Sequence, residues 1–233
     1  MKNELKKNDF SVSLEIFPPK KEEEFAGAFE LLDKLALLNP DFISVTYGAG
    51  GSRSKKTVEM TSYIKNTLHI PALAHLTCVG NTKKDIDTVV ADLKAAGINN
   101  VLALRGDRPA YMTDEQYNAR EFEHASDMIA YLKETTDFKI AGACYPEKHF
   151  EAFSFKEDVR YLKQKVDLGV EMLISQLFFD NEMFYRFEEM TQIAGINIPI
   201  CAGIMPITTS KQLGTTVSLS GSTVPKKLAD IIA

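Results

Sequence analysis

Residues 83–107 have the sequence KKDIDTVVADLKAAGINNVLALRGD and contain one complete repeat of the fold. Apolar side chains recur at intervals of three and four through Lys83–Ala96, which predicts an amphipathic helix. Gly97 follows as the left-handed residue with which helices commonly end. The apolar run Asn100–Arg105 predicts a buried strand, and it finishes in the polar group Arg105-Gly106-Asp107. The stretch therefore predicts a helix, a short connection and a strand with a polar tip.

The same unit recurs along the chain, with no linker or charge block between copies. Strand starts are roughly 26 to 38 residues apart, the length of a strand, a helix and two short connections. Seven apolar runs predict strands at Ser11–Phe17, Phe42–Tyr47, Ala72–Cys78, Asn100–Arg105, Phe138–Tyr145, Met172–Phe179 and Ile198–Met205. Helical patterns lie between them at Glu22–Leu38, Lys55–Leu68, Lys83–Ala96, Glu121–Glu134, Lys156–Leu168 and Asn181–Ala194, and Gly169 and Gly195 close two of them as Gly97 does.

Regular alternation of strands and helices predicts an α/β fold with a parallel sheet, either an open doubly wound sheet or a closed (β/α)8 barrel. The strand ends favour the TIM-type barrel. Its site is built from many strand ends, whereas an open sheet concentrates its site at one switch point. Polar groups follow six strands, at Glu15, Thr46, His75, Arg105–Asp107, Tyr145–Glu147 and Gln176.

We expect residues 1–233 to form a single TIM-barrel catalytic domain in which only seven strands can be counted. Residues Val224–Ile232 predict the start of a further helix, so an eighth strand would follow Ala233. The expectation is a barrel truncated at its C-terminus, because an open barrel leaves the edges of two strands unpaired.

The composition excludes several classes of protein. The chain is 45% hydrophobic and 25% charged, as soluble globular proteins are. Its 27 Lys and Arg against 32 Asp and Glu give a net charge of −5, so no basic surplus exists for nucleic acid or an anionic membrane. The polar start MKNELKKNDF and the lack of a long apolar run predict a cytoplasmic protein without a signal peptide or membrane span. Three widely spaced cysteines, Cys78, Cys144 and Cys201, predict reduced thiols.

Glu15 is the strongest catalytic candidate. The two-residue period of its strand places Ser13, Glu15 and Phe17 on one face, opposite an aliphatic face. With the aliphatic face against the helices, Glu15 points into the barrel mouth, where partial desolvation would raise its pKa and suit it to general acid catalysis. The alternative is a Glu held by a salt bridge to an Arg or Lys of the barrel.

Two further strand ends carry candidate ligand contacts. Arg105-Gly106-Asp107 brings a cation, a flexible turn and an anion to one tip, where Gly106 lets a planar ligand approach and Asp107 can bond the edge of a heterocycle. The alternative is an ordinary βα turn with a local ion pair. Gln176 would need hydrogen-bond partners at the barrel mouth, which a ligand could supply.

Several weaker signals stay open. The loop Gly48–Ser52 could cradle a phosphate, but it lacks the P-loop and dinucleotide spacings, so a plain flexible loop is the alternative. His75 and Cys78 are spaced like metal ligands, but no second pair supports zinc, and no metal is predicted. His75 and His149 are better candidates for hydrogen bonds to a phosphate or a ring oxygen.

Taken together, six motifs resemble methylenetetrahydrofolate reductase of the bacterial type, over a match that runs from about Asp9 to the C-terminus. The motifs are Leu14–Lys20 (LEIFPPK), Ser44–Ala49 (SVTYGA), Ala74–Cys78 (AHLTC), Leu104–Asp107 (LRGD), Tyr145–His149 (YPEKH) and Ser175–Asp180 (SQLFFD). The resemblance implies a flavoprotein barrel that uses FAD to pass a hydride from NADH or NADPH to 5,10-methylenetetrahydrofolate. The product, 5-methyltetrahydrofolate, serves methionine biosynthesis in one-carbon metabolism. A homo-oligomer is also implied.

The resemblance assigns roles to individual residues. Glu15 matches the general acid that protonates the folate so that its five-membered ring opens to an iminium, and Asp107 matches a carboxylate that helps stabilise this cation beside the flavin. Gln176 matches a contact to folate and nicotinamide, Thr46 a nicotinamide-side position and Gln212 a folate-side one. The implied FAD contacts are Tyr47, Ala49, His75, Arg105, Gly106, Asp107, Ala125, Tyr145, His149, Ala152, Asp158 and Lys165.

The chain departs from the family pattern at two places. Relatives often have further polar FAD contacts where this chain has Tyr161 and Gln164, and they place an aromatic residue over the ligands where it has Leu213–Thr216. Two other hypotheses stay open. One is a truncated barrel that binds flavin or folate without turnover. The other is an aldolase or zinc methyltransferase barrel, which would need a Schiff-base Lys at a strand end or tightly bound zinc.

Overall fold

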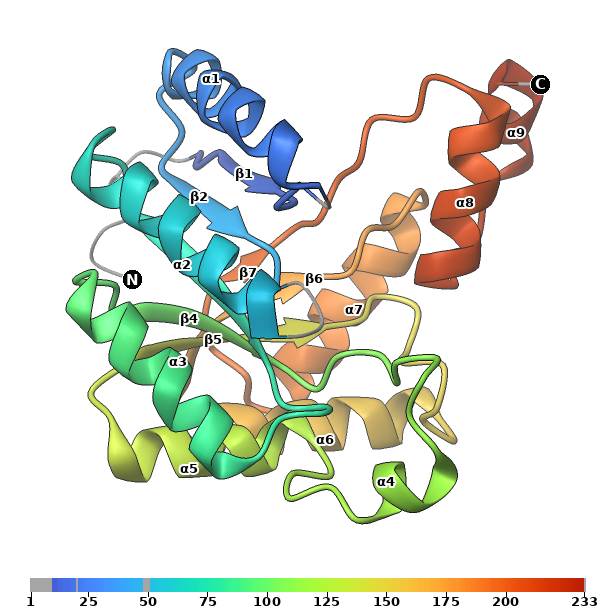
Figure 1. Cartoon of the computed structure of the whole chain (residues 1–233). Helices are drawn as coiled ribbons and strands as arrows, with labels where there is room; N and C mark the ends of the chain where they lie inside the picture. The colour runs from blue at the N-terminus through green and yellow to red at the C-terminus, as the bar shows by residue number, and fades with distance from the viewer. Residues whose placement is uncertain (1–9, 20, 48–50, 233) are drawn as a thin grey trace. The chain divides into compact units, whose positions relative to one another are not determined.

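The computed structural model describes residues 10–19, 21–47 and 51–232 and, at 51–53 and 219, the backbone only (Figure 1). The loop residues 48–50, with the FAD contact expected at Ala49, lie outside the described residues. The chain divides into two compact units, Met1–Ala141 and Gly142–Ala233. Each unit is built from the same strand and helix repeat.

The strand order follows the chain, β1-β2-β3-β4-β5-β6-β7, with helices between the strands. Strands β1 to β4 pair in parallel with their neighbours, as do β6 and β7, which is what the alternation predicted. The expected α/β fold of the TIM-barrel class, with seven strands, is therefore confirmed. The strands are β1 Ser13–Ile16, β2 Phe42–Val45, β3 Ala72–Thr77, β4 Asn100–Leu104, β5 Lys139–Cys144, β6 Val170–Ser175 and β7 Ile200–Cys201.

The helices follow the predicted pattern closely, and their ends explain why. Gly97, Gly169 and Gly195 have φ angles of 73°, 105° and 74°, so the left-handed caps expected from the sequence are present. The helical elements are the 3-10 turn η1 Glu22–Glu24 and helices α1 Phe25–Ala36, α2 Gly51–Asn66, α3 Lys83–Ala95, α4 Asp114–Asn118, α5 Ala125–Thr135, α6 Phe155–Asp167, α7 Asn181–Ile193, α8 Ser210–Ser220 and α9 Lys226–Ile232. Within the described ranges, no helix is both long and apolar enough to cross a membrane.

In the first unit, helices cover one face of strands β1 to β4 (Figure 1). Helix α2 packs on β2 and β3, α5 packs on β4, and α1 and α3 contact α2. The register pairs Glu15 with Ser44 and Ser44 with Leu73, so alternate residues of the three strands share a face. The fully buried Ile43, Val45 and Ala74 belong to the opposite set and form the core against the helices.

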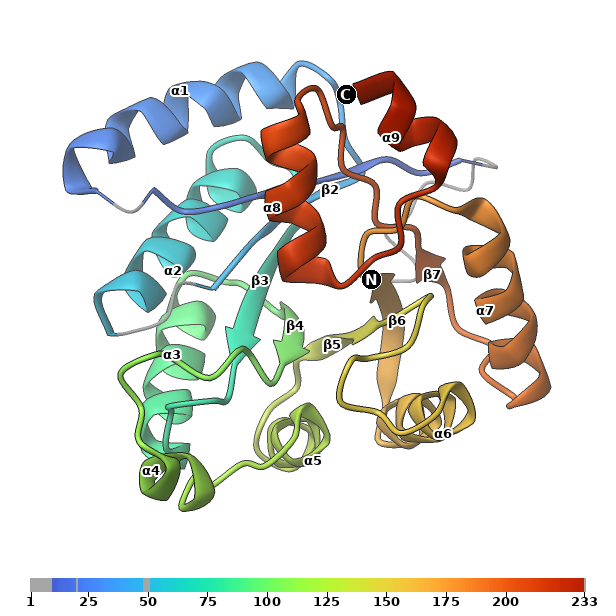
Figure 2. The same cartoon turned by 90° about the vertical axis from the view of Figure 1, so that its right-hand side faces the viewer.

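In the second unit, α6 packs on β6 and against α7, and β6 pairs with β7 (Figure 2). Its core contains the buried side chains Leu162, Leu173 and Phe187. Phe187 also meets the ring of Phe155 edge-on, at a centroid distance of 6.3 Å. These apolar contacts fix α6, which carries the candidate site residues Asp158 in its first turn and Lys165 in its last.

Four elements differ most from the prediction. The strand expected over Met172–Phe179 begins at Val170 and ends at Ser175. The strand expected over Ile198–Met205 shortens to the two residues of β7, because the Gly203 N–H donates to the Ser175 hydroxyl (2.8 Å) instead of to a strand carbonyl. Helices α4 and α8 were not predicted, because neither segment has the regular apolar spacing of an amphipathic helix. Capping defines them: the Thr113 and Thr209 hydroxyls accept from the third backbone N–H of each helix.

Candidate active site

A carboxylate, an imidazole and a hydroxyl lie together on neighbouring strands of the first unit. Glu15 Oε2 on β1 accepts from Ser44 Oγ on β2 at 3.4 Å and lies 3.3 Å from Nε2 of His75 on β3. The approach of His75 has ion-pair length but lacks the alignment of a hydrogen bond. Among the described residues, this buried nitrogen has no hydrogen-bond partner. His75 is buried, whereas 43% of the Glu15 side chain is exposed, so a ligand can reach the carboxylate.

The electrostatics of Glu15 correct one expectation. Burial raises the pKa of the Glu15 carboxyl, as predicted, but the neighbouring His75 and the Ser44 hydroxyl outweigh burial and leave the pKa below its ordinary value. The carboxylate is therefore ionised at neutral pH in the ligand-free chain. The partner also differs from the salt-bridge alternative, since a histidine stands where an Arg or Lys was expected.

Thr46 and Tyr47 follow β2 and are held by their own neighbours. The Thr46 N–H donates to the Ile16 carbonyl (3.0 Å), and the Thr46 carbonyl accepts from Thr57 Oγ1 (2.9 Å). Burial raises the pKa of the Tyr47 phenol, although side-chain hydrogen bonds with Ser54 and Asn81 oppose the shift. Tyr47 is thus a neutral phenol. It is held by Ser54 on α2 and by Asn81 in the connection between β3 and α3.

The tip of β4 has a backbone that only glycine fits well. Gly106 has a φ of 83°, and a Cβ placed there would lie 2.9 Å from the Val79 side chain and 3.1 Å from that of Thr77. Arg105 Nε lies 3.4 Å from the Gly106 carbonyl. Asp107 is exposed, and no hydrogen bond or ion pair with another described residue is seen for its carboxylate. A bare backbone beside a free carboxylate can receive a ligand.

Ala125 is the first residue of α5, and its surroundings are built by Asp127. The Asp127 carboxylate accepts from the backbone N–H groups of Glu123 (2.9 Å) and His124 (2.8 Å), which fixes the start of the helix. The nearby Cys78 thiol is fully buried, and burial raises its pKa to about 12. Cys144 in the second unit also has its pKa raised to about 12 by burial, so both thiols are unreactive.

In the second unit, the loop between β5 and α6 holds Tyr145, His149 and Ala152. The His149 ring meets Tyr145 edge-on at 4.7 Å between centroids, and the His149 backbone N–H donates to Asp158 Oδ2 on α6 (3.1 Å). The Ala152 N–H donates to the His149 carbonyl (3.0 Å). Burial raises the pKa of Asp158, against the opposing effects of the His149 N–H and of Lys165. The structure therefore brings Tyr145, His149, Ala152 and Asp158 together.

Lys165 lies on α6 and reaches the end of β5, and Gln176 directly follows β6. The Lys165 ammonium donates to the Ala143 carbonyl (2.6 Å), and burial lowers its pKa. The Gln176 N–H donates to the Cys144 carbonyl (2.8 Å), and its side-chain oxygen accepts from the Leu177 N–H (2.9 Å). Within the described residues the side-chain NH₂ of Gln176 has no hydrogen-bond partner, which leaves two donors for a ligand.

Gln212, expected on the folate side, lies in the first turn of α8. Its side-chain oxygen accepts from Thr208, and its amide nitrogen donates to the Pro206 carbonyl (3.0 Å), so the whole amide is engaged in the turn before α8. Thr216, in the segment where the resemblance implied an aromatic residue, is buried, with its hydroxyl 3.9 Å from the Met205 sulfur. Of the departures on α6, Tyr161 lies on the surface and Gln164 is exposed.

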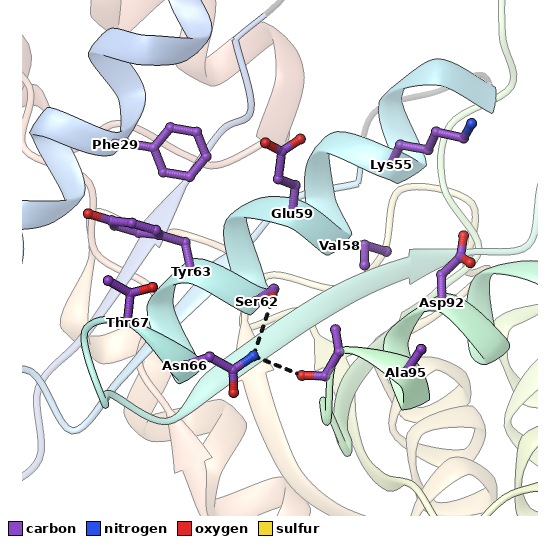
Figure 3. A pocket seen from close by; sticks show the side chains of 11 residues that line it. Phe29, Lys55, Val58, Glu59, Ser62, Tyr63, Asn66, Thr67, Asp92 and Ala95 are labelled. Atoms are coloured by element: carbon purple, nitrogen blue, oxygen red, sulfur yellow. Dashed lines mark hydrogen bonds between the residues drawn. The ribbon is translucent and has the colours of Figure 1, made fainter.

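A groove of about 580 Å³ also lies in the first unit, but on its helical layer. Figure 3 shows Phe29 and Tyr63 facing each other at one end, with ring centroids 4.7 Å apart, and Lys55 and Asp92 toward the other. Asn66 donates to Ser62 and to the Ala96 carbonyl across its floor. No residue predicted for the site lines this groove, and the strand ends carry the chemistry instead.

Sequence reasoning missed three residues that support the site. Ser44 donates to Glu15, while Ser54 and Asn81 bond the Tyr47 phenol. For Ser44 a signal existed, because the two-residue period of β2 places it on the same face as Thr46. No local signal marked Ser54 or Asn81. Within the described part of the chain, no three His, Cys, Asp or Glu side chains are arranged to hold a metal ion.

The fold together with a carboxylate, an imidazole and an amide at strand ends defines an enzyme of the TIM-barrel class. Among solved structures, an uncharacterized protein from Clostridium thermocellum that binds two copies of 5-methyl-5,6,7,8-tetrahydrofolic acid has a TM-score of 0.64 at 16% identity. That match covers 95% of this chain and 75% of the other. The fold is what this similarity shows.

The methylenetetrahydrofolate reductase family model matches residues 1–233, and the chain belongs to this family. It is 36% identical over 221 residues to 5,10-methylenetetrahydrofolate reductase of Escherichia coli (strain K12), covering 95% of this chain and 73% of that one. It is 33% identical to methylenetetrahydrofolate reductase (NADH) 1 of Arabidopsis thaliana, covering 98% of this chain and 40% of the plant protein. The resemblance seen in the six motifs is confirmed, and the chain is an oxidoreductase whose reaction is methylenetetrahydrofolate reduction.

Proposed function

We propose that this chain uses FAD to transfer a hydride from NADH or NADPH to 5,10-methylenetetrahydrofolate, and that its product supplies methionine biosynthesis in one-carbon metabolism. The observation that carries the proposal is the Glu15, Ser44 and His75 cluster, which places a ligand-accessible carboxylate at a strand end of a family member. We further propose a single catalytic domain that works in the cytoplasm as a homo-oligomer.

The residues of the chain fit a bound FAD. Nε2 of His75 is buried without a hydrogen-bond partner among the described residues, and such atoms are costly unless a ligand completes them. Gly106 leaves its backbone bare where a Cβ would collide with Val79 and Thr77. Arg105, Tyr47 and Ala125 would contact the cofactor in the first unit, and Tyr145, His149, Ala152, Asp158 and Lys165 in the second. When bound, FAD would accept the hydride from the nicotinamide and pass it to the folate.

Glu15 would supply the proton that opens the folate ring. Since its carboxyl is ionised in the ligand-free chain, it must take up a proton when a ligand binds. A folate over the half-exposed side chain would remove water and raise the pKa further, and an imidazole engaged with a ligand would stabilise the carboxylate less. Proton uptake is therefore coupled to substrate binding rather than built into the free protein.

The remaining site residues would bind the folate and the nicotinamide or stabilise the charge that develops on the folate. The exposed Asp107 carboxylate would face the cation that forms on the opened folate, where opposite charge lowers the barrier. The free NH₂ of Gln176 would donate to a carbonyl of folate or nicotinamide. Thr46 would lie on the nicotinamide side, while Gln212, whose amide bonds its own turn, would contact folate through its aliphatic part.

The visible absorption spectrum of the purified protein tests the proposal. We expect a yellow protein that oxidises NADH or NADPH with an artificial acceptor and, separately, reduces methylenetetrahydrofolate. Protein that stays colourless and binds no added FAD would contradict it.

Glu15→Gln tests the assigned role. We expect the variant to retain hydride transfer from nicotinamide to flavin and to lose folate reduction, because only the second half-reaction consumes the proton. His75→Gln serves as a comparison, because this variant should weaken flavin binding, whereas Glu15→Gln should not. Loss of both half-reactions in Glu15→Gln would show that Glu15 has a structural role instead.

A further inference from the structure

The turn between α8 and α9 is tied to two strand ends of the second unit (Figure 2). Gly221, with a φ of 69°, ends α8 in the left-handed conformation, and the next side chain, Ser222, is buried. The Ser222 hydroxyl donates to the Leu177 carbonyl after β6 (2.6 Å). The Thr223 N–H donates to both carboxylate oxygens of Glu147 after β5 (2.9 and 3.1 Å). We call Gly221, Ser222 and Thr223 the anchored turn.

The bond to Leu177 reaches the substrate contact proposed at Gln176. The Leu177 N–H donates to the side-chain oxygen of Gln176 (2.9 Å), while the Leu177 carbonyl accepts from Ser222. The Gln176 carbonyl also accepts from the Ser175 hydroxyl (2.9 Å), which holds the peptide between Gln176 and Leu177. Together these hydrogen bonds fix the backbone N–H against which the Gln176 amide rests.

The Leu177 N–H decides which end of the Gln176 amide faces a ligand. A backbone N–H can only donate, so the side-chain oxygen turns toward it and the NH₂ turns away. Within the described residues that NH₂ has no hydrogen-bond partner, and Gln176 is half-buried. This strand end therefore offers two donors, which match a carbonyl oxygen of the substrate. A shift of the Leu177 backbone would let the amide rotate and would lose the match.

The contact between Ser222 and Leu177 is built to hold that backbone in place. It joins residues that lie 45 apart in the sequence, so it is not part of a local turn. The hydroxyl is buried, where the loss of its partner would be costly. Charge-assisted hydrogen bonds are stronger than neutral ones, so the Glu147 carboxylate holds Thr223 and, with it, the neighbouring Ser222.

We propose that Ser222 is a positioning residue for substrate binding: through the Leu177 carbonyl it holds the Gln176 amide with its NH₂ toward a carbonyl oxygen of the folate, and Glu147 holds Ser222 in place. The proposal rests on the proposed function, in which Gln176 contacts the folate. It gives a role to Glu147, which lies in the motif YPEKH and to which the resemblance assigns none.

Kinetics of Ser222→Ala, alone and combined with Gln176→Ala, test the role. Alone, Ser222→Ala should raise the KM for methylenetetrahydrofolate about fivefold and leave kcat nearly unchanged, because one hydrogen bond made equally in the ground and transition states is weakened. In the Gln176→Ala background, Ser222→Ala should have no further effect, since it acts through that amide. A merely structural role of Ser222 would add its effect in both backgrounds.

Ser218→Ala is the matched control, because the exposed Ser218 hydroxyl makes the same kind of bond within α8, to the Thr215 carbonyl (2.8 Å). Its KM should equal that of the wild type. Glu147→Ala is a second variant that leaves the buried hydroxyl in place. It should raise the same KM, and it should do so only while Gln176 is present.

Amide hydrogen exchange at Leu177 tests the positioning without turnover. Ser222→Ala should speed exchange of the Leu177 N–H about fivefold, because its bond to the Gln176 side chain loosens, and Ser218→Ala should not. A wild-type protein that reduces no folate would refute the proposed function, and exchange at Leu177 would still decide the positioning. The proposal is overturned if exchange at Leu177 is unchanged in Ser222→Ala, or if this variant raises the KM equally in the Gln176→Ala background.

Discussion

Gly203→Ala tests how closely the backbones of β6 and the segment after β7 approach in the second unit. A Cβ at residue 203 would lie 2.3 Å from the Ser175 carbonyl oxygen, whereas ordinary contact begins at 3.4 Å, so the backbone must separate by roughly 1 Å. The Gly203 N–H bond to Ser175 Oγ (2.8 Å) would stretch with it. Overpacking and a weakened hydrogen bond together cost about 2–4 kcal/mol.

The assay is thermal and urea unfolding of the variant beside Gly214→Ala. Gly214 lies inside α8 with nothing within 4 Å of an added Cβ, so alanine there should gain up to about 1 kcal/mol of helix stability. For a chain of this size we expect Gly203→Ala to unfold about 5–15 °C lower. Because Ser175 precedes Gln176, folate reduction should fall as well. If Gly203→Ala proves as stable as Gly214→Ala, the close approach at Ser175 is wrong.

Three further predictions concern the charge of Glu15, the backbone at Gly106 and the loop that precedes α6. Because the folded pKa of Glu15 is lowered, its contribution to stability is present above the ordinary carboxyl pKa and is lost as pH falls through the folded one. The difference in unfolding free energy between wild type and Glu15→Gln should therefore shrink between neutral and acid pH, and a constant difference would contradict the shift. Gly106→Ala should cost about 2–3 kcal/mol and Gly221→Ala only about 1 kcal/mol in urea unfolding, since both have positive φ but only Gly106 would clash; equal costs would contradict this. Glu157→Ala should speed amide hydrogen exchange at Phe153 about fivefold and Asp158→Ala likewise at His149, each leaving the other amide unchanged.

Most of the fold could be predicted because the chain repeats one locally encoded unit. Gly97, Gly169 and Gly195 mark helix ends, and the left-handed φ angles found there are what a residue without Cβ provides. The end of β7 could not be predicted, because the apolar pattern continues past Cys201 while the Gly203 N–H turns to a side chain on another strand. Such a bond depends on tertiary structure and leaves no periodic signal.

The candidate site was predictable in position but not in charge. The two-residue period placed Glu15 on the correct face, yet its pKa depends on His75 and Ser44, which lie 60 and 29 residues away in sequence. Burial alone predicts a raised pKa for Glu15, but His75 and Ser44 bring this pKa below its ordinary value. The hydrogen bonds of the Gln212 amide within its own turn likewise leave no signal in the sequence.

The parallel registers also bear on how the chain finds its fold. Ser13 pairs with Phe42, Ile43 with Ala72, Ala74 with Val101 and Leu173 with Ile200, so each of these four pairings closes a loop of 27 to 29 residues. The entropy of closing a loop depends on its length, so every pairing carries nearly the same cost. Each strand can dock on a neighbour made shortly before it, and assembly can proceed strand by strand as the ribosome releases the chain.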